Sequence, residues 1–362
     1  MKAAICYEYG QPLSVEDVQI DAPQYGEVQV RIKAVAICHS DVHRIRGDWK
    51  GRLPIVVGHE AAGIVERVGE GVQTVQPGDR VAISLLRSCG RCFQCVSGAT
   101  HLCEGTFAIG AESRLHNQQG QALLHGLNTA AFAEAAIVDQ SQLVRVPAEL
   151  PLDRAALLAC GIITGVGAVI NTAQVRPGSN VVVIGTGGVG LNAVQGAVLA
   201  GASQIIALDI LDHKLATAVT FGATAAINAA SNDPRQAVRD LTSGRGADYV
   251  FVTVGNAQAI SQGLSLLRTG GTAVIVGLPR RDALAQVSAY DLVSKGQRIQ
   301  GSFMGSSRLS IDVPWLAQLY LQGRLKIDEL ITARYSLSQI NEAIETMEGG
   351  EALRNVIIFG EE

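Results

Sequence analysis

The chain has 362 residues, of which 48% are hydrophobic and 17% are charged, and its formal net charge is −4. This length and composition indicate an ordinary globular protein of two domains, with no sign of a nucleic-acid surface. No apolar run approaches the roughly 18 residues that a membrane span needs. The sequence reaches Glu8 before a signal-peptide core could form, so we expect a cytoplasmic protein.

Residues 1–150 consist mostly of short strand-like stretches separated by turn residues. Residues 27–37 are rich in β-branched side chains, and residues 61–72 alternate partly between apolar and polar side chains before a Gly-rich turn. A Pro-Gly-Asp turn at residues 77–79 leads into another strand-like stretch. This half of the chain is therefore predicted to be a mostly β domain.

Strand-like and helix-like stretches alternate after about residue 160. Residues 180–210 read as a buried strand, a glycine turn, a helix and a second buried strand, and residues 247–255 and 271–279 supply further short strands. Such alternation predicts a parallel sheet covered by helices on both faces. The tail, from about residue 304, contains two helix-like stretches and a last strand at 355–359, and we assign it to the first domain.

A glycine motif follows the strand-like stretch at residues 180–184. Gly185, Gly187 and Gly190 have the spacing G-x-G-x-x-G, and a helix-like stretch begins within the motif. The first glycine would form the turn, the second would let backbone approach a pyrophosphate, and the third would let helix and strand pack. Asp209 ends the next strand, where a carboxylate binds the ribose 2′-OH and repels a 2′-phosphate. The motif predicts a dinucleotide site that prefers NAD to NADP.

Four cysteines lie within one short loop: Cys89, Cys92, Cys95 and Cys103. Four thiolates at this spacing can surround a zinc ion tetrahedrally and leave no open coordination position. Seven cysteines would be an odd set for a disulfide framework, and clustered thiols in a reducing compartment are more often metal ligands. We therefore expect a structural zinc in this loop.

The stretch AVAICHSDVHRIRG, residues 34–47, brings a thiol, a hydroxyl, a carboxylate and two imidazoles close together in sequence. It could be a polar turn without function. Its Cys38, however, forms a Cys₂His set with His59 and Cys160, and such a set leaves a fourth position for water or substrate. An open site of this kind is typical of a catalytic zinc. The remaining cysteine, Cys6, is expected to pack in the core.

Together these segments resemble the zinc-dependent medium-chain alcohol dehydrogenases, in particular the class I and class III enzymes. The resemblance covers essentially the whole chain and rests on segments in family order: GHEAAGIVERVGEGV, the four-cysteine loop, CGIITGVGA, GTGGVG and ALDI. It implies an α/β fold in which a Rossmann domain with a doubly wound parallel sheet spans residues 162–303. A mostly β, GroES-like catalytic domain, residues 1–161 and 304–362, would carry the structural zinc lobe.

The resemblance also implies roles around the catalytic zinc. Its ligands would be Cys38, His59 and Cys160, with Glu60 just behind as an alternative or second-sphere ligand. Asp41 would accept a hydrogen bond from His59 and orient the imidazole. Ser40 would take the proton from the alcohol, and His43 would receive it through the nicotinamide ribose and pass it to solvent.

A larger set of residues would contact NAD according to the same resemblance. Two basic residues would meet the pyrophosphate, a lysine would reach the adenosine ribose, and apolar residues would flank the adenine and the nicotinamide. The set comprises His39, Thr164, Gly185, Gly187, Gly188, Val189, Gly190, Asp209, Ile210, Lys214, Val254, Leu278 and Arg354.

The expected reaction is NAD-dependent oxidation of alcohols to aldehydes or ketones, and the reverse, by hydride transfer from a zinc-bound alkoxide. Trp49, Leu85 and Phe107 would line an apolar substrate pocket, and Gly126 would leave extra room where many members carry a bulky aromatic side chain. We therefore expect bulky apolar or aromatic alcohols to be favoured as substrates.

Two other functions remain as alternatives. A glutathione-dependent formaldehyde dehydrogenase would need an acid and a base where Trp49 and Phe107 stand, although Asp48 would restore the acid after a shift of one residue. A non-enzymatic binding protein on this fold would have no need to keep the zinc ligands and the relay residues together. The long segment between Cys103 and Phe132 favours a homodimer over a tetramer, with residues 271–279 and 299–305 near its two-fold axis.

Overall fold

The computed structural model describes residues 1–350 and 352–360, and contacts divide the chain into two compact units. The first unit comprises Met1–Cys160 and Arg308–Glu362, and the second comprises Gly161–Ser307. The sequence-based boundaries at 161/162 and 303/304 lie close to these limits. The tail belongs to the first unit from Arg308 onward, whereas the sequence analysis placed its start at residue 304.

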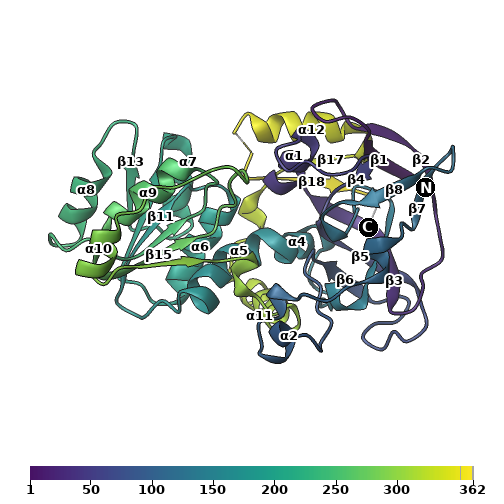
Figure 1. Ribbon diagram of the computed structural model, residues 1–362, viewed down its shortest axis with the longest axis horizontal. Coiled ribbons are helices and arrows are strands. Elements are labelled where there is room, and N and C mark those ends of the chain that lie inside the picture. The colour runs from purple at the N-terminus through teal and green to yellow at the C-terminus, as the bar shows by residue number, and fades with distance from the viewer. Residues whose placement is uncertain (351, 361–362) are drawn as a thin grey trace. The chain divides into compact units, whose positions relative to one another are not determined.

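The first unit is built mainly from strands. Five of its strands form a closed barrel in the order β1-β2-β7-β8-β4, and a 7-stranded sheet has the order β10-β6-β5-β3-β18-β17, with β9 also paired to β3 (Figure 1). The strands are β1 (Lys2–Cys6), β2 (Ser14–Ile20), β3 (Glu27–Ala36), β4 (Ile55–Val56), β5 (Glu60–Val68), β6 (Arg80–Ile83), β7 (Leu115–Asn117), β8 (Ala122–His125), β9 (Ala135–Asp139), β10 (Leu143–Arg145), β17 (Ile331–Tyr335) and β18 (Arg354–Ile358). The helices are α1 (His39–Arg46), α2 (Phe93–Val96), α3 (Ala108–Ala111), α4 (Leu152–Leu157), α11 (Leu309–Leu321) and α12 (Ile340–Glu348).

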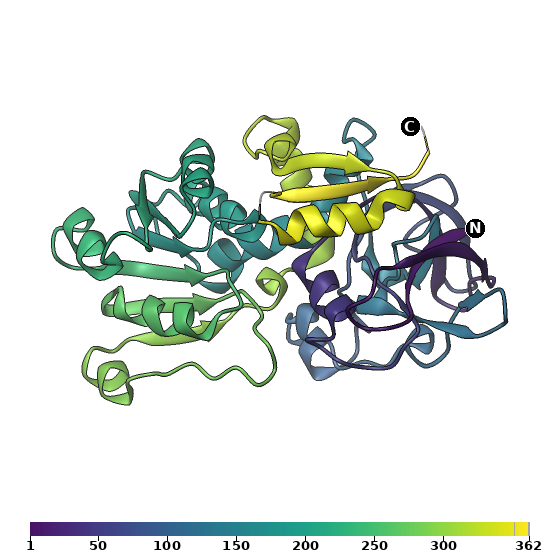
Figure 2. The same cartoon turned by 90° about the horizontal axis from the view of Figure 1, so that it is seen from above.

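Strand β3 is central to the arrangement of this unit. It pairs antiparallel with β5, β9 and β18, so the C-terminal strand is hydrogen-bonded to a strand near the N-terminus. Figure 2 shows the yellow C-terminal strands and α12 together. Six of the ten positions on β3 are apolar, and the valines and isoleucine among them belong to the unit's hydrophobic core. The chain leaves the end of β3 directly into α1, which carries several candidate site residues.

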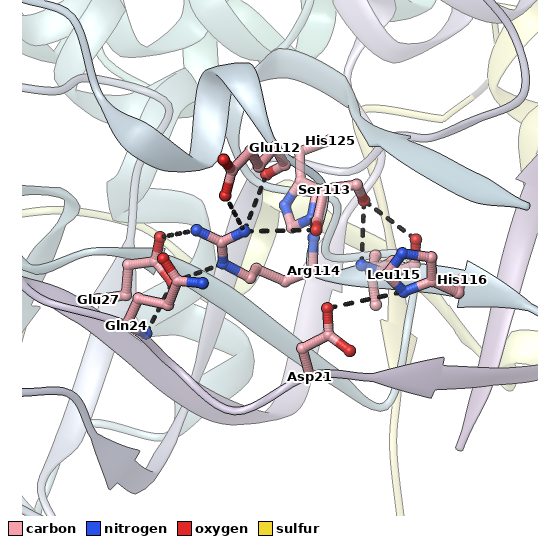
Figure 3. A network of polar contacts seen from close by, with 9 residues as sticks. All are labelled: Asp21, Gln24, Glu27, Glu112, Ser113, Arg114, Leu115, His116 and His125. Carbon is pink, nitrogen blue, oxygen red and sulfur yellow. Dashed lines mark hydrogen bonds and ion pairs between the residues drawn. The ribbon is translucent and has the colours of Figure 1, made fainter. Parts of the chain in front are cut away.

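A buried ion pair connects the start of β3 to the segment that precedes β7. Arg114 donates from Nε to Glu27 Oε2 at 3.0 Å and from Nη2 to Oε1 at 2.9 Å, and both residues are almost wholly buried (Figure 3). Glu112 Oε2 accepts from Nη1 of the same guanidinium at 3.3 Å. Removal of one partner from such a pair leaves an uncompensated buried charge, at a cost of about 3–5 kcal/mol. The pair thus fixes the segment that leads from the cysteine loop back to the barrel.

The second unit is a parallel sheet flanked by helices on both faces (Figures 1 and 2). Its strand order, β13-β12-β11-β14-β15-β16, is the 3-2-1-4-5-6 order of a doubly wound nucleotide-binding fold. The strands are β11 (Asn180–Ile184), β12 (Gln204–Asp209), β13 (Ala225–Asn228), β14 (Ala247–Val252), β15 (Leu267–Ile275) and β16 (Arg298–Gly301). The helices are α5 (Ile163–Gly167), α6 (Gly188–Leu199), α7 (Asp212–Thr220), α8 (Pro234–Leu241), α9 (Ala257–Ser265) and α10 (Ala289–Ser294). The expected fold class is confirmed in both units.

One helical stretch, Leu152–Thr172, is long and apolar enough by composition to cross a membrane. Sequence analysis expected no such stretch, because it found no apolar run that approaches roughly 18 residues. The stretch is 89% buried within the protein, which is typical of a core helix. It offers weak support at most for a membrane span.

Candidate functional site

The site in the first unit is organised by a fully buried carboxylate, Asp41, on the first turn of α1. Asp41 Oδ2 accepts from the backbone N–H of Cys38 at 3.1 Å, and Oδ1 accepts from that of Gly58 at 2.9 Å. Oδ1 also lies 3.0 Å from Nδ1 of His59, which confirms the expected hydrogen bond. A ring that donates from Nδ1 presents Nε2 as its acceptor, so Asp41 fixes both the tautomer and the direction of His59.

Four buried side chains meet beside Asp41: Cys38, His59, Glu60 and Cys160. One ligand atom from each lies within 4.8 Å of the others. His59 Nε2 and both carboxylate oxygens of Glu60 are buried without any hydrogen-bond partner. Buried polar atoms are rarely left unpaired in proteins. A cation bound between them would satisfy all of them, and the two thiols and imidazole are donors that zinc favours, so the residues fit the expected metal.

The two thiols of this cluster affect each other's ionisation. A hydrogen bond from Cys160 lowers the pKa of Cys38 well below its usual range, against the effect of burial. The same hydrogen bond and then burial raise the pKa of Cys160. Two neighbouring thiolates in a buried site therefore need a cation to coexist, which is the charge that a bound zinc supplies.

Glu60 faces Arg354 on the far side of the cluster. Burial raises the pKa of Glu60 to about 8, although the charge of Arg354 opposes the shift. The Arg354 Nε atom lies 3.6 Å from Glu60 Oε2, and Arg354 is only 4% exposed. Arg354 is therefore not a solvated surface charge. Its expected contact with the cofactor pyrophosphate stays a prediction.

The four-cysteine loop forms a second cluster, in which one sulfur atom from each of Cys89, Cys92, Cys95 and Cys103 lies within 4.8 Å of the others. The sulfur of Cys103 accepts backbone N–H groups of Cys89 and Gly105 at 3.2 and 3.3 Å. Backbone N–H groups lower the pKa of Cys92 to about 6, whereas burial and then neighbouring cysteines raise that of Cys95 to about 12. None of the seven cysteines, all of them in the described residues, forms a disulfide, and this cluster suits a four-coordinate zinc without an open position.

The expected relay residues share α1 with the buried carboxylate. Ser40 and His43 are both half-buried. His43 Nδ1 lies 2.7 Å from Asp48 Oδ2, and its ring lies 5.0 Å from the Trp49 ring, tilted by 32°. Sequence analysis considered Asp48 only as an acid for glutathione. Its pairing with His43 was missed because the turn after α1 determines which way the carboxylate points.

The glycine motif forms the turn between β11 and α6 in the second unit. Gly185 has a φ of +87°, and a Cβ there would lie 2.3 Å from the Val254 side chain. A Cβ at Gly190 would lie 1.8 Å from the carbonyl oxygen of Gly185. A Cβ at Gly187 would meet nothing within 4 Å, and Gly187 caps α6 without a side-chain hydrogen bond. The helix therefore presents backbone N–H groups to open space, which suits a bound pyrophosphate.

Asp209 lies at the end of β12 beside this turn. Its Oδ2 accepts from the backbone N–H and hydroxyl of Thr186 at 2.7 and 3.0 Å, and its Oδ1 accepts from the N–H groups of Ile210 and Leu211. The carboxylate is thus held rigidly at the carboxyl end of the parallel strands, where nucleotides bind in this fold. These four hydrogen bonds use the roughly four lone-pair sites of the carboxylate, so a ribose hydroxyl would have to share an oxygen with one of these donors or replace it.

The other residues that we expect to contact the cofactor differ in how far they are buried. Thr164 is buried, with its hydroxyl 3.6 Å from the Met304 sulfur, and the adjacent Gly165 packs closely against Val189. The exposed members are His39, Ile210 and Leu278, whereas Gly188 is buried and Lys214 and Val254 are half-buried. Their contacts with NAD remain predictions.

The expected substrate-pocket residues Trp49, Leu85 and Phe107 are all half-buried. The Arg87 guanidinium lies over the Phe107 ring, 5.4 Å from its centre. Arg87 also lines a cavity of about 220 Å³ together with Arg44 and Arg52. Arg87 therefore places a positive charge beside Phe107, a feature that sequence reasoning missed because nothing about Arg87 distinguishes it from a surface charge.

The interpretation of Gly126 was wrong. A Cβ at Gly126 would lie 2.6 Å from both the carbonyl oxygen of Val56 and the side chain of Val57. The glycine is buried against β4 and does not leave a space open to substrate. Its small size serves backbone packing at the start of a 3₁₀ turn, Gly126–Asn128.

Comparisons with known proteins agree with this arrangement. Residues 24–148 match the family described as "Alcohol dehydrogenase GroES-like domain", and residues 188–321 match "Zinc-binding dehydrogenase". The chain is 39% identical to "Alcohol dehydrogenase class-3" from Pisum sativum, over 98% of this chain and 97% of that protein.

Solved structures are similar over the same length. A protein from Burkholderia ambifaria, described as an alcohol dehydrogenase zinc-binding domain protein, has a TM-score of 0.95 at 37% identity, with 99% of each chain covered. Benzyl alcohol dehydrogenase from Acinetobacter calcoaceticus has a TM-score of 0.93 at 33% identity, again with 99% of each chain covered. The chain therefore belongs to the zinc-dependent medium-chain alcohol dehydrogenase family.

Proposed function

We propose that this alcohol dehydrogenase uses NAD to interconvert alcohols with aldehydes or ketones, with one catalytic and one structural zinc per chain. The observation that carries the proposal is the buried cluster of Cys38, His59, Glu60 and Cys160, in which His59 Nε2 and both Glu60 carboxylate oxygens have no hydrogen-bond partner. When bound, zinc would lower the pKa of an alcohol hydroxyl and NAD would accept the hydride.

The chain's own residues would orient the metal ligands and move the proton. Asp41 holds His59 through Nδ1 and thereby keeps Nε2 directed at the cluster. Ser40 would take the proton of the alcohol hydroxyl at Oγ, and His43 would accept the relayed proton and release it to water. A cytoplasmic location stays a prediction, which is supported by seven cysteines that form no disulfide.

The cofactor would be NAD, because Asp209 is fixed where the 2′ position of an adenosine ribose would bind. The 2′-phosphate of NADP would meet a carboxylate whose position is fixed by four hydrogen bonds. Like charges placed together in this way cost several kcal/mol. We therefore infer that NADP is a much poorer cofactor than NAD.

The preferred substrates would be bulky apolar or aromatic alcohols. Support comes from the half-buried rings of Trp49 and Phe107 and from similarity to a benzyl alcohol dehydrogenase. Each Å² of apolar substrate surface buried against these rings would contribute about 25 cal/mol before ordering costs.

The enzyme would be a homodimer joined through the edge of the second unit's sheet. Strand β16 is last in the strand order, and all four of its residues are exposed. Ile299 on this strand, Phe303 just after it and Val293 on α10 expose apolar surface. An exposed edge strand flanked by apolar side chains can pair with a second chain, so a second copy of this chain is the proposed partner.

Metal analysis of cysteine variants tests the two zinc sites. We expect Cys89→Ser to lose one zinc and to lower the melting temperature by several degrees, because a structural zinc contributes to folding. Cys160→Ser should stay folded but lose at least about 100-fold in kcat. Cys6→Ser, at a buried cysteine outside both clusters, is the matched control. A fully active enzyme that holds fewer than two zinc ions would contradict the assignment.

Cofactor preference tests Asp209. The unmodified enzyme should prefer NAD to NADP in kcat/KM on the order of 100-fold. Asp209→Gly should relax this ratio, and Asp209→Asn should relax it while retaining part of the hydrogen bonding. Asp282→Gly, at an exposed position in the same unit, should leave the ratio unchanged. Equal efficiency with both cofactors in the unmodified enzyme would refute the role of Asp209.

A substrate series tests the apolar pocket. Benzyl alcohol should exceed ethanol in kcat/KM by roughly 10-fold or more. Trp49→Ala should reduce this ratio. The Trp49 ring also contacts His43, so the substitution could lower the activity on both alcohols. Because both substrates depend on His43 equally, that effect cancels in the ratio. The same series should include formaldehyde with and without glutathione. If ethanol or hydroxymethylglutathione is the best substrate, the apolar-pocket proposal fails.

Analytical ultracentrifugation tests the dimer. Ile299→Lys places a charge on the exposed edge of β16 and should shift the protein towards monomer. Ile311→Lys makes the same change at an exposed isoleucine on α11 and should leave the oligomeric state unchanged. A tetramer, or a dimer that Ile299→Lys does not weaken, would argue against this interface.

A further inference from the structure

His43 and Asp48 form a close pair at the end of α1. The Nδ1 atom of His43 lies 2.7 Å from Oδ2 of Asp48, and both side chains are about one-third exposed. Helix α1 ends at Gly47, whose φ is +84°, and the backbone N–H groups of Asp48 and Trp49 both point back to the His43 carbonyl oxygen. The turn therefore places the Asp48 carboxylate next to the imidazole of His43, which lies five residues earlier in the sequence.

We propose that Asp48 is a positioning residue for the proton relay: it holds His43 in the tautomer and orientation that accept a proton. This inference rests on the proposed function, in which His43 is the last protein group of the relay. It goes beyond that function because Asp48 would act only through His43 and would not touch substrate.

The chemical argument follows from what each group can donate. A carboxylate only accepts hydrogen bonds, so the imidazole nitrogen beside it, Nδ1, must carry the hydrogen. In a neutral imidazole Nε2 is then the free base, and it can accept a relayed proton. The proton lost by the alcohol becomes bound at Nε2 and passes to bulk water, and His43 returns to its starting form without any change of redox state.

Packing limits the motion of the same ring. The Trp49 ring lies 5.0 Å away at a tilt of 32°, so His43 is held by a hydrogen bond at one side and an aromatic contact at another. A histidine with this exposure but without these contacts would sample several rotamers, and only some of those rotamers would place Nε2 correctly. Asp48 is engaged in this pair and is thus poorly suited to bind the ammonium group of glutathione.

The test is a double-mutant cycle on the complete zinc-loaded enzyme with NAD and benzyl alcohol. Asp48→Ala should lower kcat by about 10-fold, with the KM for alcohol changed by less than about 2-fold. His43→Ala should lower kcat as well, and adding Asp48→Ala to His43→Ala should cause no further loss, because Asp48 acts through His43. Added imidazole buffer should restore part of kcat in all three variants by supplying a base.

Asp21→Asn is the matched control, because Asp21 faces another imidazole, His116, at 3.7 Å elsewhere in the same unit. It should leave kcat unchanged. Equal losses from Asp48→Ala with and without His43, or no loss at all, would overturn the proposal. A loss seen only with hydroxymethylglutathione would also overturn it and would favour a substrate-binding acid. Full activity of His43→Ala would instead rule out the proposed relay. An unmodified enzyme that is inactive on every alcohol would rule out the proposed function.

Discussion

The hydrogen bonds to the buried Asp41 carboxylate are the constraint on which the candidate metal site depends. Asp41 joins two segments that are separated in sequence, the start of α1 and the Gly58–His59 turn before β5, through three donors at about 3 Å. A fully buried carboxylate without these donors would carry a large desolvation cost. Because the same oxygen serves both Gly58 and His59, the backbone turn and the imidazole cannot move independently. The ligand arrangement is thus part of the fold.

The parts of the site that could be predicted from sequence are those whose chemistry demands certain residues at short separation. The four-cysteine loop and the glycine motif are examples, because a tetrahedral set of thiolates and a turn that closely approaches a pyrophosphate tolerate few alternatives. The alternation of strand and helix patterns likewise predicted the parallel sheet, and the strand order agrees with it. Local spacing was sufficient wherever one element supplied the whole feature.

Other parts depend on contacts that spacing does not encode. Glu60 meets Arg354, and Glu27 meets Arg114, across separations that only the folded sheet brings together. Gly126 shows a different limit. The family resemblance suggested room for substrate at this position, but a side chain there would clash with the backbone of β4. The direction of Asp48 depends on the left-handed turn at Gly47. In each case a side-chain environment, rather than a residue type, determines the role.

The two cysteine-containing clusters differ in the contacts that keep their residues in place when no cation is bound. Cys38 and Cys160 sit beside sheet strands and α4, and Ser84 at the end of β6 donates its hydroxyl to the Ala159 carbonyl oxygen at 2.7 Å. These elements belong to the buried part of the unit, so they would keep their positions if one ligand were lost. The cysteine loop has only the four-residue helix α2 and a short 3₁₀ turn, and its polar contacts are largely backbone N–H groups donated to sulfur. Those contacts favour the thiolate form, and thiolates crowded together require a cation. Metal and local fold are therefore coupled in the loop, whereas in the other cluster the fold is formed first and the metal is added to it.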